Sequence, residues 1–157
     1  MRVPTFRDLT PAECEEFLRQ HHVGRIAFLH DGSVDIEPIH YVFVDEWLFG
    51  RTGQGTKLES IEQRPWVAFE VDDVHSLFDW RSVVVHGTVY LLADDGAPLD
   101  RDVFARALEL LRTLLPETLT PDDPTPARTA VFGLHVDRIS GRAAEVRTMR
   151  ATPGSRR

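Results

Sequence analysis

The sequence has a single cysteine, Cys14, so no disulfide can form within the chain, which is typical of a protein in a reducing compartment. It has no apolar run of membrane-spanning length, and its first residues lack the apolar stretch of a secretory signal. An excess of positive charge is also absent, since 25 acidic residues outnumber 18 basic ones and the net charge is −7. A broad surface for nucleic acid or anionic membrane is therefore not expected. These absences predict a cytoplasmic protein without nucleic-acid or membrane partners.

Several catalytic and metal-binding motifs are missing too. The seven histidines are dispersed, with no HxxxH or HExxH spacing, so no metal site is predicted. No GxSxG elbow is present for a serine nucleophile. The paired acids Asp72-Asp73 and Asp94-Asp95 fall at predicted turns, where solvated turn formation explains them better than catalysis.

The most informative segment that is present runs from Arg51 to Lys57, with the sequence RTGQGTK. Its two glycines allow a sharp turn and the close approach of a ligand. Thr56 followed by Glu59 predicts a capping box that opens a helix. A helix start attracts anions, and Arg51 and Lys57 add two cations. We therefore expect a cradle for one phosphate, of the kind that a nucleotide-like cofactor carries.

A purely structural role for this segment stays open, because glycine-rich connections join strands to helices in many proteins that bind nothing there. The segment is not a Walker loop, since the lysine does not follow a GxxxxG frame and no Ser or Thr comes after it. It is not a dinucleotide fingerprint either, because the third glycine of GxGxxG is missing. The motif alone predicts an anion site without identifying the ligand.

The rest of the chain predicts about six strands joined mostly by short turns. Thr10, Pro11 and Glu13 form a helix start, and Gly24 is expected to end that helix. Gly87 inside a β-branched run predicts a bulge. We expect helices at 10–21, 57–62 and 98–115, strands at 25–30, 33–44, 47–50, 66–71, 82–92 and 130–139, and loops at 72–79 and 116–126.

This order of elements favours a mainly β fold, an antiparallel barrel with peripheral α-helices. The length suits one domain. We expect that domain to cover residues 1–147, followed by a polar, disordered tail over residues 148–157.

Five short motifs occur in an order that resembles one family. They are VGRIA at 23–27, PIHYV at 38–42, LFGRTGQGTK at 48–57, RPWVAFEV at 64–71 and WRSVVVHG at 80–87. Over about residues 8–145 the chain resembles the pyridoxamine 5′-phosphate oxidase-like FMN-binding split barrels, in particular the nitroimidazole-reductase-like subgroup. The resemblance implies an antiparallel split β-barrel in a homodimer, with FMN at the interface.

The resemblance also implies which residues meet the cofactor. The residues expected to hold the FMN phosphate are Arg51, Thr52, Gly55, Thr56 and Lys57. Those expected to border the isoalloxazine ring and ribityl chain through backbone groups are Ile39, His40 and Tyr41. Those expected to line the same cleft are Trp80, Arg81 and Ser82. His40 is also a candidate proton donor to a substrate, although no catalytic residue is assigned.

The implied function is that of an FMN-dependent oxidoreductase, which takes electrons from a nicotinamide donor and reduces a small organic substrate. Two departures from the family pattern leave alternatives open. Gly50 stands where nitroimidazole-reductase-like members often have a histidine, and residues 146–157 hold no recognisable substrate-phosphate clamp. Vitamin B6 synthesis is therefore not expected. A non-catalytic flavin-binding sensor or storage protein, a deazaflavin-dependent reductase and a cofactor-free interaction module stay as alternatives.

Overall fold

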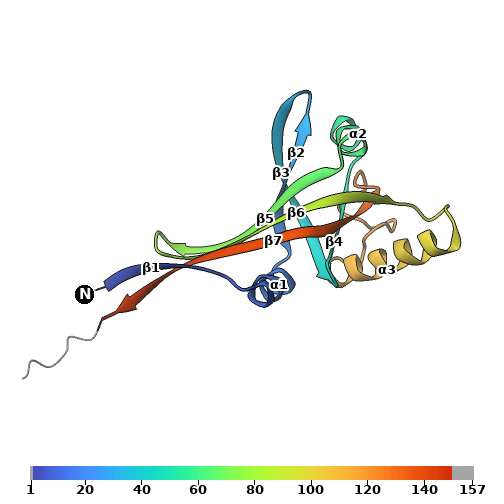
Figure 1. The fold of residues 1–157 in the computed structure, drawn as a ribbon. Coiled ribbons are helices and arrows are strands. Elements are labelled where there is room, and N and C mark those ends of the chain that lie inside the picture. The colour runs from blue at the N-terminus through green and yellow to red at the C-terminus, as the bar shows by residue number, and fades with distance from the viewer. Residues whose placement is uncertain (1, 150–157) are drawn as a thin grey trace, which may run out of the picture.

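The computed structural model describes residues 2–149 and is dominated by one antiparallel sheet (Figure 1). In chain order its elements are β1 (Arg2–Asp8), α1 (Pro11–Gln20), β2 (Val23–His30), β3 (Ser33–Val44), β4 (Trp47–Thr52), α2 (Thr56–Gln63), β5 (Trp66–Ser76), β6 (Asp79–Leu92), α3 (Pro98–Leu114) and β7 (Ala130–Thr148).

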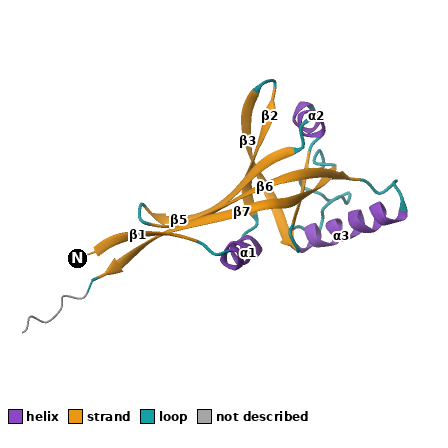
Figure 2. Cartoon of the chain, viewed as in Figure 1, coloured by secondary structure: helices purple, strands orange, loops and turns teal. Residues whose placement is uncertain are grey.

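The sheet closes into a barrel of six strands. Their order is β7-β4-β3-β2-β5-β6, and β6 pairs back onto β7, which leaves β1 as an additional strand on β7. Closure gives each of these six strands a partner on both sides, which leaves fewer sheet edges open to pairing with other chains. Figure 2 shows the three helices at the periphery of the strands. The predicted antiparallel split β-barrel with peripheral helices is therefore confirmed.

Two-residue turns fix the register of β2–β3 and β3–β4. Asp31 and Gly32 both have positive φ, 49° and 76°, and Asp45 and Glu46 repeat the pattern with 48° and 67°. Two consecutive left-handed residues are typical of the hairpin turn whose twist matches that of the flanking strands. The sequence signal Asp-Gly was correctly interpreted as a hairpin.

The start of α1 is as predicted, but its end is not. Thr10 Oγ1 accepts a hydrogen bond from Glu13 N at 3.2 Å, and Thr10 N donates one to Glu13 Oε2 at 2.8 Å, which completes the capping box. The helix ends at Gln20, and Gly24 lies inside β2 instead of ending the helix. A Cβ at Gly24 would come within 2.4 Å of the Phe69 ring, so close packing explains this glycine.

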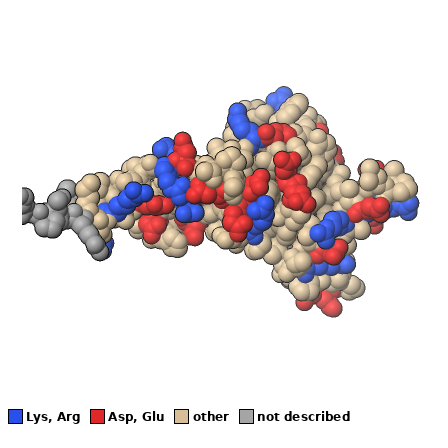
Figure 3. Space-filling model, turned by 60° about the horizontal axis from the view of Figure 1, so that its bottom comes forward, with Lys and Arg blue, Asp and Glu red and all other residues tan. Residues whose placement is uncertain are grey.

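The second half of the chain forms longer strands than predicted. Residues 72–76, expected to be part of a loop, continue β5 into a hairpin with β6, and β7 extends nine residues beyond the predicted end at 139. The ends of β5, β6 and β7 together with β1 form an arm that projects from the barrel (Figure 1). Seen from another side, the arm is narrower than the body, and acidic and basic side chains are interspersed over the visible face (Figure 3).

Apolar side chains form two buried clusters. The larger fills the barrel and includes Tyr41, Phe69 and Leu134, each at most 1% exposed. The smaller lies between α3 and the outer face of the sheet, where Ala107 and Leu111 occupy positions i and i+4 on the same side of the helix. The helix expected at 98–115 is thereby confirmed, and α3 covers the outer face of β3 and β4.

The bulge expected at Gly87 is present, because the β6–β7 register shifts between His86 and Gly87. A Cβ at Gly87 would lie 2.1 Å from the carbonyl oxygen of His135, so only glycine allows this close approach.

Two further expectations concern the ends of the chain and membranes. The predicted tail lies outside the described residues apart from Thr148, which ends β7 opposite Arg2, and Met149. Among residues 2–149, no helix combines the length and apolar character needed to span a bilayer.

Candidate functional site

The glycine-rich segment does not act as one unit, because β4 continues through Arg51 and Thr52. Consecutive residues of a strand point to opposite faces of the sheet. The Thr52 side chain is buried at the end of the barrel, where it lines a small gap together with Lys57 and Ile39. Arg51 faces the other way, into a cavity beneath α3. The structure therefore separates the two cations that the sequence predicted to flank one phosphate.

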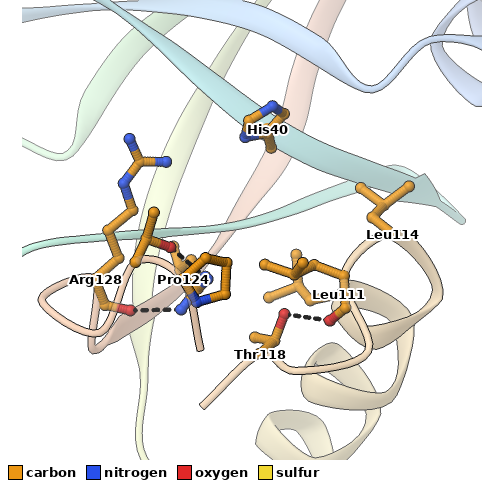
Figure 4. A pocket seen from close by; sticks show the side chains of 9 residues that line it. His40, Leu111, Leu114, Thr118, Pro124 and Arg128 are labelled. Atoms are coloured by element: carbon orange, nitrogen blue, oxygen red, sulfur yellow. Dashed lines mark hydrogen bonds between the residues drawn. The ribbon is translucent and has the colours of Figure 1, made fainter. Parts of the chain in front are cut away.

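Arg51 is fully engaged by the loop that follows α3. Its Nη2 donates to Asp123 Oδ1 at 3.0 Å and to Thr125 Oγ1 at 2.8 Å. Its Nη1 donates to the carbonyl oxygen of Arg128 at 3.2 Å, a bond drawn in Figure 4. The pair is buried, with the Arg51 side chain 10% exposed and that of Asp123 2% exposed. The hydrogen bond from Arg51 holds the pKa of Asp123 well below its usual value. We call this pair the Arg51–Asp123 latch.

The predicted capping box at the start of α2 is wrong. Gly55, with φ of 141°, is the N-cap residue, no side chain caps the helix, and Thr56 is already the first helical residue. Glu59 therefore lies one position too late to bond back to the cap. The first-turn N–H groups of α2 consequently have no side-chain acceptor, which leaves them available to an anion.

Lys57 lies in this first turn and reaches across to β3. Its Nζ forms an ion pair with Glu37, whose side chain is 41% exposed. The structure thus brings together Thr52, Gly55, Thr56 and Lys57 beside Ile39. The gap that Ile39, Thr52 and Lys57 line has a volume of about 10 Å³, so a larger ligand at this position has to lie outside it.

Backbone groups of β3 border the same region. The β3–β4 ladder ends at the pair Tyr41–Gly50, whereas β4 stays paired with β7 through Thr52. The edges of Ile39 and His40 that face β4 therefore lie beyond the ladder. Tyr41 can approach a ligand only through its backbone, because its ring is buried and its hydroxyl donates to the carbonyl oxygen of Leu18 at 2.9 Å. Burial raises the pKa of that hydroxyl.

Gly50 faces the barrel interior. A Cβ at this position would lie 2.7 Å from the Phe132 ring, so a histidine side chain has no space there. The residue of β4 that faces the cavity beneath α3 is the next one, Arg51.

The third predicted group lies near the other end of β6. The Trp80 ring packs against Phe6, and Arg81 Nη2 lies 3.8 Å from Glu145 Oε1. Ser82 pairs with Arg142 of β7.

The distance between this group and Lys57 follows from strand geometry. Leu91, which also lines the gap beside Lys57, follows Trp80 by 11 residues on the same strand. At the usual strand rise this is a separation of about 35 Å. Within one chain, Trp80, Arg81 and Ser82 are therefore too far from Lys57 to contact the same ligand.

The cavity beneath α3 has a volume of about 330 Å³ and lies between β3, β4, α3 and the following loop. In Figure 4, His40 lies above this space, Leu114 to its right, Pro124 and Thr118 below it, and Arg128 to its left. Sequence reasoning found His40 and Arg51 but missed Arg128 and the apolar wall. The loop was predicted, but no sequence pattern indicates that it packs against β4.

The described residues contain no group of three His, Cys, Asp or Glu side chains arranged to hold a metal ion. Cys14 is buried, and burial raises the pKa of its thiol. A packing role fits this residue better than reactivity.

Comparison with known proteins shows relatives of similar fold. A FAD-binding protein from Mesorhizobium loti is 27% identical, with a TM-score of 0.71 over 87% of this chain and 96% of that one. The FAD binding protein from Mycobacterium smegmatis is also 27% identical, with a TM-score of 0.62 over 88% and 98% of the two chains. A FAD and heme binding protein from Mycobacterium smegmatis shares the fold at 18% identity, with a TM-score of 0.60 over 88% and 73%.

No curated protein is similar enough to this chain to count as a relative. The sequence model of the family described as pyridoxamine 5′-phosphate oxidase matches residues 10–143. Together with the closed antiparallel barrel, this match over most of the chain shows that the protein belongs to the pyridoxamine 5′-phosphate oxidase family.

Proposed function

We propose that this protein binds a flavin through the start of α2 and uses it to reduce a small organic substrate. The observation that carries the proposal is the uncapped first turn of α2, which presents free N–H groups beside Lys57 and Thr52. Charge-assisted hydrogen bonds from such groups to a phosphate are of the stronger kind. The two solved structures that are 27% identical to this chain are FAD-binding proteins, which supports a flavin as the ligand.

Lys57 is the cation that can serve the phosphate. Its present partner, Glu37, is partly exposed, and ion pairs near the surface contribute only about 0–1 kcal/mol. A dianionic phosphate can therefore replace it. Arg51, whose donors are taken by Asp123 and its neighbours, acts instead as a positioning residue for the loop. One helix start and one lysine suit a single terminal phosphate, so we propose FMN as the flavin.

A second copy of the chain completes the proposed site. Trp80, Arg81 and Ser82 lie about 35 Å from Lys57 along β6, so one protomer cannot place both groups on one flavin. In a homodimer, the Trp80–Ser82 segment of one protomer can meet Lys57 of its partner. The arm offers an apolar surface for such contacts, since Phe6, Leu77 and Val146 are exposed along it.

In this arrangement a bound flavin supplies hydride transfer, with a nicotinamide as the proposed donor. The backbone of Ile39 and His40, beyond the end of the β3–β4 ladder, orients the ring system. The exposed imidazole of His40 faces the neighbouring cavity, where it can donate a proton to a substrate that accepts the hydride.

The test uses the fact that Lys57 is the only lysine of the chain. An amine-acetylating reagent can modify only this side chain and the N-terminal amine, which serves as the internal control. We expect FMN to protect Lys57 from acetylation while the N-terminal amine reacts at an unchanged rate. Lys57→Ala should lose flavin binding with the fold intact, and Arg64→Ala, at the other end of α2, should keep it.

Acetylation of Lys57 at the same rate with and without a bound flavin would contradict the phosphate assignment. Mass analysis of the ligand released by denaturation distinguishes FMN from FAD or a deazaflavin. Oxidation of a nicotinamide donor by the loaded protein distinguishes a reductase from a sensor or storage protein.

A further inference from the structure

The cavity beneath α3 has the size and closure of a small-molecule site and is separate from the Lys57 region. Its volume of about 330 Å³ lies at the lower end of the range for ligand pockets. Its walls come from three parts of the fold: β3 and β4, the C-terminal half of α3, and the loop that follows α3 (Figure 4). The Arg51–Asp123 latch holds that loop against β4, so the cavity is formed before any ligand enters.

The charges lining the cavity favour an anion. Arg51 is neutralised by Asp123, which lies behind it. Arg128 uses its carbonyl oxygen to accept from Arg51, and its guanidinium forms no ion pair with any residue between 2 and 149. No carboxylate lines the cavity in this part of the chain. A guanidinium without a counter-charge is well suited to a bidentate bond with a carboxylate.

The remaining wall is apolar. The cavity is lined opposite His40 by Leu111 and Leu114 of α3, by Leu115 directly after it, and by Pro124 of the loop. Burial of an apolar body against such side chains contributes roughly 25 cal/mol per Å² of surface removed from water. A ligand that binds both the Arg128 guanidinium and the apolar wall has an anionic end and a compact apolar body.

We propose that the cavity beneath α3 binds a small organic carboxylate, with the carboxylate on Arg128 and its apolar body against the leucines of α3. His40 lines the cavity and belongs to the β3 segment expected to border the flavin, so a carboxylate bound here would lie beside the proposed flavin. That position relative to a flavin rests on the proposed function, whereas the binding site does not.

The experiment is an amide NMR titration of the full-length protein with benzoate as the probe and benzamide as its uncharged match. We expect benzoate to bind at least about tenfold more tightly than benzamide, because only benzoate gains the charge-assisted bond. Arg128→Ala and Arg128→Gln should each weaken benzoate binding by at least about tenfold and leave benzamide unchanged. The matched control is Arg101→Ala, an exposed arginine of α3 that does not line the cavity.

Equal affinities for benzoate and benzamide would overturn the inference. It would also be overturned if both Arg128 variants changed the affinity for benzoate by less than about twofold. The titration is repeated on Lys57→Ala. If Lys57→Ala has lost flavin binding but still binds benzoate, the two sites are separate. If a protein that binds flavin does not bind benzoate, the carboxylate site is rejected and the proposed flavin site is unaffected.

Discussion

At the scale of single residues, Arg51 shows how tertiary contacts can engage a side chain that the local sequence assigns to a ligand. Its position beside two glycines predicts a phosphate ligand, but its guanidinium is buried against Asp123, Thr125 and the carbonyl oxygen of Arg128. A buried ion pair is costly to break on one side, because the remaining charge is left without a partner. The Arg51–Asp123 latch therefore orders the loop between α3 and β7.

We predict that Arg51→Ala lowers the hydrogen-exchange protection of the amides of Leu119 and Thr125 by at least about tenfold, because both donate to Asp123. Arg128→Ala keeps the carbonyl oxygen that Arg51 uses and should leave this protection unchanged. Unchanged protection in Arg51→Ala would show that the loop is held by its apolar contacts.

The same latch has a defined pH dependence. Arg51 holds the pKa of Asp123 below its ordinary value of about 3.9, so the pair contributes stability above that pH and loses it as the pH falls further. The difference in protection between wild type and Arg51→Ala should therefore be constant from about pH 7 to 5 and shrink only below about pH 4.

At the scale of elements, the two short helices begin in opposite ways. Thr10 and Glu13 satisfy each other's backbone N–H groups at the start of α1, whereas no side chain caps α2 at Gly55. Hydrogen bonds from Arg7 and then from the Thr10 backbone lower the pKa of Glu13 to about 2. This capping contribution is therefore present above the ordinary Glu pKa and is lost as the pH falls toward 2. Side chains therefore satisfy the N–H groups at the start of α1, whereas no side chain does so at the start of α2.

The contrast predicts different effects for two similar substitutions. Thr10→Ala should lower the free energy of unfolding by about 1 kcal/mol, which is typical for loss of an N-cap. Thr56→Ala should change that free energy by less than about 0.5 kcal/mol in the flavin-free protein, since Thr56 caps nothing. Urea unfolding at pH 7 measures both, and equal losses would contradict the different roles of the two threonines.

At the scale of the whole molecule, the long strands separate two groups of residues that the resemblance places around one cofactor. Lys57 and Thr52 lie at one end of β6, and Trp80, Arg81 and Ser82 lie near the other. In the proposed homodimer each protomer would contribute half of every site, and the exposed apolar residues of the arm would be available for its interface.

Subunit mixing tests this arrangement. Lys57→Ala and Arg81→Ala homodimers should each bind flavin weakly, and exchange of their subunits should restore about a quarter of the wild-type sites. The restored site combines the intact Lys57 of one protomer with the intact Arg81 of its partner. Flavin titration before and after exchange measures the gain, and no restoration would indicate a site contained within one protomer. Mixing Lys57→Ala with Arg64→Ala provides the control: Arg64→Ala should bind flavin normally, so subunit exchange with it should give no gain in flavin sites.

The sequence by itself determined the local structure and much of the fold. The Asp-Gly turn and the Thr10 capping box follow from interactions between near neighbours, so composition and spacing predicted them correctly. The bulge at Gly87 was also predicted, from a glycine inside a β-branched run, although the contact with His135 that requires glycine lies between strands. The order of motifs indicated the family, which the match over residues 10–143 confirms.

Only the tertiary structure decided which side chains meet. Strand alternation turned Arg51 away from Thr52, and a loop more than 60 residues later supplied Asp123 to bind it. The cavity that combines His40 with Arg128 likewise depends on segments far apart in the chain. Local patterns carry no information on such contacts, because packing over the closed barrel, and not spacing along the chain, sets the distance between those residues.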